Sequence, residues 1–423
     1  LPPNSFTSLM EMEIIQAPNP DLKWETTISR NIGLDFGFFN NRLSGTIDAY
    51  WNTTKDLLMC IPIDETTGYS YQYQNIGQTS NKGIEIALNY DILRTKDFTL
   101  GVSATYNYNH NNIDELADNI IAQYGSQWAS SATTPTYDYE FREGKPVGLI
   151  RGYICDGYYT TADFNYDPAT KTYTLKPGVA DLGNQVGNYP SHYNLPEGQK
   201  AFPGAVKLRD LDGNGVADTE DVADLGEITH PHTGGFNLNM TWKDIDFSAG
   251  FAWAAGGHVY NVNSLINMYG NKDTGAGANK LEFISDCYQI YDIQNGELVP
   301  VVEPDALDAL NTGAKDGVPY MENGTVLSTF VEDASFLRLN TLTVGYTFPK
   351  AWTKKIGMQR ARVYATAGNL FTITGYSGID PEVNADPNKS TTAANTGNYP
   401  LLGMDYGTYP RARTFTFGVN ITF

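Results

Sequence analysis

The sequence contains no long apolar run, few charged residues and few histidines. No stretch of about 20 apolar residues occurs in the 423-residue chain, so a membrane-spanning helix is excluded and only a closed β-barrel could cross a membrane. Charged residues make up 18% of the chain, against roughly 25% in a typical soluble domain. The motifs of common hydrolases and nucleotide-binding enzymes are also absent. These absences disfavour a soluble enzyme, and the sequence predicts no catalytic residues.

Cysteine and positive charge are also scarce. The three cysteines, Cys60, Cys155 and Cys287, are far apart and match no metal-binding spacing. The formal net charge is −20, which disfavours nucleic acid and other bulk anionic partners.

Glycine and aromatic residues are abundant instead, and apolar residues recur with a period of two. The chain has 41 Gly, 28 Tyr and 19 Phe. Every second residue from Phe98 to Tyr108 is apolar, and the residues between them are small or polar. Such a segment has roughly the 9 to 11 residues that a tilted strand needs to cross a bilayer, with one face toward lipid and the other toward a wet lumen.

Nine such strands are predicted, and the connections between them alternate in length. The strands are Ile32–Phe38, Leu43–Trp51, Ile84–Asp91, Phe98–Asn109, Phe236–Lys243, Ile245–Trp253, Leu342–Phe348, Ala361–Ala367 and Phe415–Phe423. Short turns follow at 40–41, 93–97, 243–244 and 349–358, whereas long outer loops are predicted at 54–80, 110–233, 255–333 and 369–411. Transmembrane barrels combine short periplasmic turns with longer extracellular loops in this way. The chain is therefore predicted to end at Phe423 on the periplasmic side.

Nine is an odd number, whereas bacterial single-chain barrels close with an even number of strands. The chain is therefore expected to be the C-terminal portion of a larger barrel, or to hold one more strand, for which Val147–Cys155 is the best candidate. A soluble β-sandwich would also show alternation, but the asymmetry between short turns and long loops has no reason to exist there. The predicted fold class is an all-β, antiparallel transmembrane barrel whose apolar face contacts outer-membrane lipid.

Eight short motifs, in their order along the chain, resemble the late barrel region of SusC-like TonB-dependent transporters. They are Asn19–Glu25, Asn75–Gly77, Asn81–Glu85, Thr233–Phe236, Ser335–Leu339, Gly368–Phe371, Gly378–Glu382 and Tyr409–Arg411. The resemblance implies a barrel of about 22 strands. In it, residues 1–27 form an incoming extracellular loop, residues 28–423 form the C-terminal part of the barrel, and an N-terminal plug lies outside this chain. It also implies import energised by TonB and a SusD-like surface lipoprotein that closes over the barrel as a lid.

The segment Asp210–Asp221 has the spacing of a calcium-binding loop. Side-chain ligands at positions 1, 3, 5, 9 and 12 would be Asp210, Asp212, Asn214, Asp218 and Asp221, with the Val216 carbonyl at position 7 and Gly215 at the sharp turn. Residues 110–233 hold 8 basic and 18 acidic side chains, so a cation would offset repulsion there. However, loops of this kind usually have a glutamate at position 12, and no helical pattern flanks the segment. We predict a structural Ca²⁺ or similar hard cation, with an acidic turn held by Asx hydrogen bonds as the alternative.

Tyrosines in the long loops are candidate contacts for substrate or lid, because sugar rings stack on aromatic faces. They are Tyr69, Tyr71, Tyr73, Tyr153, Tyr158 and Tyr159. At the other end, Phe423 after alternating apolar positions resembles the signal that barrel-insertion machinery recognises. The predicted function is the barrel part of an outer-membrane importer of bulky nutrients, oligosaccharide or peptide. A passive diffusion porin and a calcium-stabilised surface adhesin are the alternatives.

Overall fold

The structure is a computed structural model. It describes residues 16–69, 71–116, 139–140, 142–186, 192–268, 282–319, 325–383, 403–405, 407 and 409–423. The first 15 residues of the predicted incoming loop, and parts of all four predicted long loops, lie outside the described residues.

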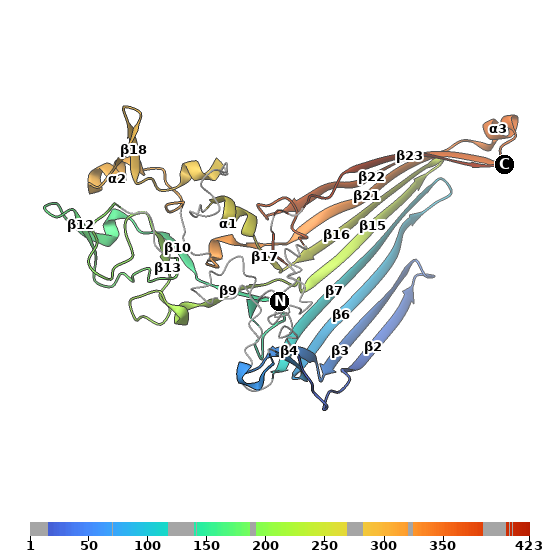
Figure 1. The fold of residues 1–423 in the computed structure, drawn as a ribbon. Helices are drawn as coiled ribbons and strands as arrows, with labels where there is room; N and C mark the ends of the chain where they lie inside the picture. The colour runs from blue at the N-terminus through green and yellow to red at the C-terminus, as the bar shows by residue number, and fades with distance from the viewer. Residues whose placement is uncertain are drawn as a thin grey trace, which may run out of the picture.

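The main element of the fold is one nine-stranded antiparallel sheet. Its strands lie side by side in the same order as they occur along the chain. Its order is β2-β3-β6-β7-β15-β16-β21-β22-β23. The strands are β2 Thr26–Phe38, β3 Leu43–Lys55, β6 Gly77–Arg94, β7 Phe98–Leu116, β15 His232–Trp242, β16 Ile245–Ala255, β21 Phe336–Thr347, β22 Arg360–Thr374 and β23 Thr414–Thr422. Figure 1 shows them as a long curved wall. All nine predicted strands are confirmed, so alternation alone located the wall.

Most of the strands extend further than alternation predicts, chiefly at the long-loop end. Strand β6 begins at Gly77 rather than at Ile84, and β7 runs to Leu116 rather than to Asn109. The residues added to β7 begin with His110, Asn111 and Asn112, which are all polar. Alternation disappears there because both faces of a strand that rises beyond the bilayer meet water or loops.

Short connections close the other end of the wall. Residues 39–42 join β2 to β3, and Asn40 and Asn41 have φ values of 56° and 61°. Asparagine tolerates this left-handed region better than most residues, which suits a tight turn. Lys243 and Asp244 join β15 to β16, and the connection from β21 to β22 contains the one-turn helix α3 Lys350–Thr353. In Figure 1, α3 and the C-terminus lie together at this end.

The long connections fold into a lobe of small sheets and short helices at the opposite end (Figure 1). The small strands are β1 Gln16–Ala17, β4 Leu58–Pro62, β5 Tyr71–Asn75, β8 Tyr139–Glu140, β9 Leu149–Gly152, β10 Cys155–Tyr158, β11 Phe164–Asp167, β12 Thr172–Leu175, β13 Val206–Leu208, β14 Ala223–Glu227, β17 His258–Tyr260, β18 Tyr291–Gln294, β19 Glu297–Pro300 and β20 Val331–Asp333. The helices are α1 Val262–Met268 and α2 Pro304–Leu310. The candidate tenth strand near Val147–Cys155 contains β9, which pairs with β14 and β8 and not with the wall.

The lobe has a hydrophobic core of its own. Tyr153, Tyr159, Tyr173 and Phe202 are fully buried in it or nearly so, together with aliphatic residues from loops far apart in the sequence. The Tyr173 hydroxyl donates to the carbonyl of Val302 at 2.6 Å, which ties the loop after β7 to the loop after β16. The loops after β7 and after β16 therefore pack as one unit in the described part of the chain.

Candidate functional site: the two faces of the wall and the loop lobe

The two faces of the nine-stranded wall differ in chemistry. One face carries exposed apolar side chains; Ile32 and Ile84, for example, are 67% and 43% exposed. The opposite face carries polar side chains that bond across strands: the Tyr50 hydroxyl donates to Asn109 Oδ1 and Asn111 Nδ2 donates to Asn81 Oδ1, both at 2.9 Å. An apolar outer face and a polar inner face are what a transmembrane barrel requires.

A charged pair on the polar face links β16 to β22 across the intervening strand. Arg362 Nε and Nη2 donate to the two carboxylate oxygens of Asp246 at 2.8 and 2.5 Å. The pair passes directly over Gly345 of β21, where a Cβ would come within 2.4 Å of Arg362 Nη2. The Arg362 guanidinium also lies 5.0 Å from the centre of the Tyr364 ring. Glycine is required at position 345 because the ion pair occupies the space of a side chain.

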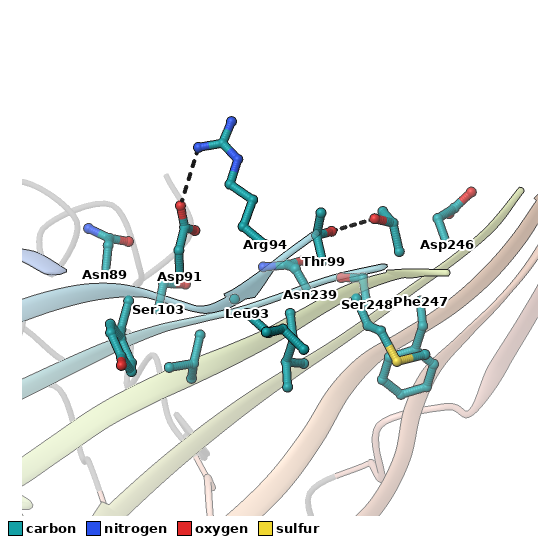
Figure 2. Close-up of a pocket in the computed structure, with 16 residues that line it drawn as sticks. Asn89, Asp91, Leu93, Arg94, Thr99, Ser103, Asn239, Asp246, Phe247 and Ser248 are labelled. Atoms are coloured by element: carbon teal, nitrogen blue, oxygen red, sulfur yellow. Dashed lines mark hydrogen bonds and ion pairs between the residues drawn. The ribbon is translucent and has the colours of Figure 1, made fainter. Parts of the chain in front are cut away.

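An open pocket of about 570 Å³ lies at the short-turn end of β6, β7, β15 and β16. Figure 2 shows Asn89, Asp91, Arg94 and Thr99 on one side of the sheet, whereas Phe247 projects from the other side. Arg94 and Asp91 form an exposed ion pair at 3.7 Å, a kind that contributes at most about 1 kcal/mol. The pocket lining contains no histidine or cysteine, and it offers hydrogen-bonding groups such as Asn89, Ser103 and Asn239.

An ion-pair network fastens the last long loop to the wall. Arg338 of β21 is 1% exposed, and its Nη2 donates to Asp380 Oδ1 at 2.6 Å. Its Nη1 lies 2.6 Å from Glu382 Oε2, as an ion pair without the alignment of a hydrogen bond. Arg411 adds a contact to Glu382 at 3.1 Å. Three of the motifs quoted above, SFLRL, GIDPE and YPR, meet in this network; the sequence showed each of them but not their convergence.

The segment Asp210–Asp221 folds as a tight loop in which carboxylates accept backbone N–H groups. Asp210 accepts from Gly213 and Gly215 at 2.7 and 2.8 Å, and these N–H groups, Gly215 foremost, lower the pKa of Asp210. Asp221 is fully buried and accepts from Leu211, Asp212 and Asp218. The loop is thus held by its own hydrogen bonds, as in the metal-free alternative.

The same loop gathers oxygens that fit a hard cation. One carboxylate oxygen from each of Asp210, Asp212 and Asp221 can lie within 4.8 Å of the others. The amide nitrogen of Asn214 donates to both Asp212 and Asp218, at 3.1 and 2.9 Å, so these side chains converge as well. The backbone of Val216 pairs with Asp181 in an isolated bridge. A carboxylate has about four lone-pair sites, so accepting two or three N–H groups leaves room for a metal bond.

The six candidate tyrosines fall into two groups. Tyr153 and Tyr159 are fully buried, and their hydroxyls donate to Gln185 Oε1 and the Ala180 carbonyl at 2.9 and 2.7 Å. The half-buried group is Tyr69, Tyr71, Tyr73 and Tyr158. Tyr71 and Tyr73 of β5 stand edge to face, 6.1 Å apart. Only the second group has ring surface that a substrate or lid could touch in this arrangement.

Phe423 directly follows β23 at the short-turn end of the wall and is 76% exposed. The strand that precedes it presents Phe415, Phe417, Val419 and Ile421 on the apolar face, all of them exposed. None of the helices in the described part of the chain is long and apolar enough to span a membrane.

Comparisons with known proteins agree with this geometry. The profile of the family described as TonB dependent receptor-like, beta-barrel, matches residues 4–421. TonB-dependent receptor P3 of Formosa agariphila is 31% identical over 96% of this chain and 35% of its own length. TonB-dependent receptor SusC of Bacteroides thetaiotaomicron is 29% identical over 96% of this chain and 33% of its own length. The chain thus spans about a third of the length of these relatives.

Among solved structures, that of the RagAB peptide transporter superposes with a TM-score of 0.65 at 25% identity, covering 96% of this chain and 36% of the other. The matched portion is the C-terminal barrel part of the larger proteins. Members of this family are outer-membrane transporters and receptors rather than enzymes. This confirms the prediction from the sequence that the chain is part of a transporter and not an enzyme. The chain belongs to the TonB-dependent receptor-like β-barrel family, as a SusC-like member.

Proposed function

We propose that this chain supplies the wall and outer loops of an active importer of bulky nutrients, oligosaccharide or peptide. In this proposal TonB energises import, a SusD-like lipoprotein closes the extracellular mouth as a lid, and the C-terminus faces the periplasm. The observation that carries the proposal is the two-faced wall with a packed loop lobe at one end. A wall of this kind separates lipid from a wide polar lumen, and the lobe provides a surface at its mouth.

The open edges of the wall support a barrel larger than nine strands. Strands β2 and β23 are the two ends of the sheet and do not pair with each other. Unpaired N–H and C=O groups cannot face hydrocarbon, so both edges need further strands in a membrane. We propose that strands outside these 423 residues close the barrel and that a plug fills it. RagAB, with which this chain shares its fold, is a peptide transporter, and that likeness supports peptide as one substrate class.

The test is uptake by cells that carry the complete protein, with and without TonB. Labelled oligopeptides and oligosaccharides of graded length serve as probes. Active import predicts that uptake of at least one class is lost when TonB is deleted. Uptake that is unchanged without TonB would instead indicate a diffusion porin. Absent uptake combined with calcium-dependent attachment to surfaces would indicate an adhesin.

We also propose that the loop Asp210–Asp221 binds Ca²⁺ or a similar hard divalent cation in a structural role. The ligands would be the side chains of Asp210, Asp212, Asn214, Asp218 and Asp221 with the Val216 carbonyl. The convergence of the Asp210, Asp212 and Asp221 carboxylates supports the proposal, because hard cations prefer such oxygen ligands. Bound there, the cation would neutralise part of an acidic lobe and fix the surface that the lid meets.

A further inference from the structure

A row of cationic side chains crosses the apolar face of the wall at its long-loop end. In the strand register Arg30 of β2 lies opposite Trp51 of β3, Trp51 opposite Lys82 of β6, and Lys82 opposite His110 of β7. Neighbouring strands are about 4.8 Å apart, so the row is about 14 Å wide. The side chains share one face because the next row toward the short turns, Ile32, Ala49, Ile84 and Tyr108, has the same parity.

These side chains project outward and are not neutralised by ion pairs. Arg30, Trp51, Lys82 and His110 are all exposed. Within the described residues, no carboxylate forms an ion pair with Arg30, Lys82 or His110. Lys82 interacts electrostatically with Asp114, whose carboxylate already accepts from Ser80 and Asn112 at 2.8 and 2.7 Å. Arg30 and Lys82 thus place two positive charges without ion pairs on a face of exposed isoleucines, in a chain of net charge −20.

Aromatic rings lie on the same face in the next two rows toward the short turns, and they mark a membrane interface there. Tyr106 and Trp253 stack with centres 6.0 Å apart, and Trp253 lies over Gly234, where a Cβ would meet its ring at 2.8 Å. His232 stacks on Tyr106 and accepts or donates a hydrogen bond with its hydroxyl at 2.9 Å. Aromatic girdles lie at headgroup level in transmembrane barrels. The cationic row therefore begins where hydrocarbon gives way to lipid headgroups.

We infer that Arg30, Lys82 and His110, flanked by Trp51, bind the phosphate-bearing headgroup of an anionic lipid in the leaflet next to the long loops. The inference rests on the proposed function, which places that end at the outer surface. Arginine and lysine donate charge-assisted hydrogen bonds to phosphate oxygens, and their aliphatic stems can lie along the apolar face while their charges reach the headgroups. His110 adds a further donor.

The test is lipid titration followed by native mass spectrometry of the complete barrel protein, with phosphatidic acid as probe. Each basic residue near a membrane surface contributes about fivefold in affinity, equivalent to about 1 kcal/mol. The double variant Arg30→Gln/Lys82→Gln should therefore weaken the tightest bound phosphatidic acid about 25-fold. Phosphatidylcholine should bind both proteins equally, and inorganic phosphate should not displace the lipid.

A matched control removes the same charge elsewhere. Lys354 and Lys355 are exposed at the short-turn end, so Lys354→Gln/Lys355→Gln changes the net charge equally while sparing the row. Equal weakening by both double variants would overturn the inference, because bulk charge would then suffice. Unchanged binding in Arg30→Gln/Lys82→Gln, with a folded barrel shown by heat-modifiable gel mobility, would also overturn it, as would displacement by inorganic phosphate. Uptake is scored separately, so failed import with intact lipid binding would reject the proposed function alone.

Discussion

The guanidinium of Arg338, on the polar face of the wall, lies 2.6 Å from the carboxylate of Asp380 in the last long loop. Both groups are withdrawn from water, with side-chain exposures of 1% and 11%. Phe336 lies beneath the guanidinium at 5.2 Å, and Thr372 accepts from its Nε at 3.0 Å. One residue of the wall thus organises a loop 42 positions later in the chain.

Replacing Arg338 should destabilise the last long loop without unfolding the wall. Arg338→Ala leaves Asp380 and Glu382 close together with only Arg411 beside them, and breaking a buried pair costs about 3 to 5 kcal/mol. We expect faster proteolysis of residues 375–383 and a lower melting temperature. Arg94→Ala is the control, because its exposed pair with Asp91 contributes at most about 1 kcal/mol. Equal stability of the two variants would contradict this role for Arg338.

The two faces of β6 can be compared at adjacent positions. Ile86 lies on the apolar face, opposite Ile47 and Tyr106, whereas Ala87 lies on the polar face, opposite Thr46 and Thr105. A lysine on a lipid face costs about 2 to 4 kcal/mol near the bilayer centre, and one in a wet lumen costs little. Ile86→Lys should therefore reduce the folded fraction in lipid vesicles far more than Ala87→Lys. If Ala87→Lys were the more damaging variant, the assignment of the faces would be reversed.

Chelation should expose the loop near Asp210 to protease while the wall stays protected. With calcium present, the Asp212→Ala variant should be as sensitive to protease as the chelated wild-type protein, because it lacks one of the converging carboxylates. The control is Asp167→Ala, which removes a carboxylate that only caps a local turn through Ala169 and Thr170. Cleavage at the same rate with and without calcium, or an Asp212→Ala protein identical to wild type, would leave the acidic turn without a metal.

The two groups of tyrosines should behave differently when they are replaced. Tyr71→Ala/Tyr73→Ala should reduce uptake or lid binding while the lobe keeps its stability, since both rings are partly exposed. Tyr153→Ala should instead destabilise the lobe, because large-to-small substitutions of buried aromatics cost about 3 to 5 kcal/mol. Thermal melting and uptake are measured on both variants. Normal uptake and normal lid binding with Tyr71→Ala/Tyr73→Ala would end the contact hypothesis for these two residues.

Deletion of Phe423 should reduce the amount of barrel inserted in cells while transport per inserted molecule stays unchanged. The residue projects beyond β23 and is 76% exposed, so its loss removes little packing within this chain. Surface labelling counts inserted molecules, and uptake is divided by that count. Phe417→Ala is a comparison on the same strand, because it removes an apolar-face ring but keeps the terminus. Normal insertion without Phe423 would argue against an assembly signal.

The alternation of apolar and polar residues predicted the wall because each strand there has one face in an apolar environment and the other in a polar one. Phe98 to Asn109 shows this pattern, and β7 forms there. The lobe could not be predicted in the same way, because its core is built by pairs such as Tyr158 and Ala314, which lie 156 positions apart. The spacing of Asp210–Asp221 predicted a compact acidic loop. Only the structure showed that Asp221 is buried and already bonded to three backbone N–H groups.

The alternation of short turns and long loops bears on how such proteins can diversify. The entropic cost of closing a connection rises by only about 0.6 kcal/mol for each doubling of its length. The long connection 117–231 therefore costs roughly 3 to 4 kcal/mol more than the two-residue turn at Lys243 and Asp244. The pairing of β7 with β15 is set by the wall itself and extends over eleven residues of β15. Insertions, deletions and exchanges in the lobe therefore leave the strand register unchanged. The loops at the mouth of the barrel can therefore change during evolution to accept a new substrate while the membrane-spanning strands stay the same.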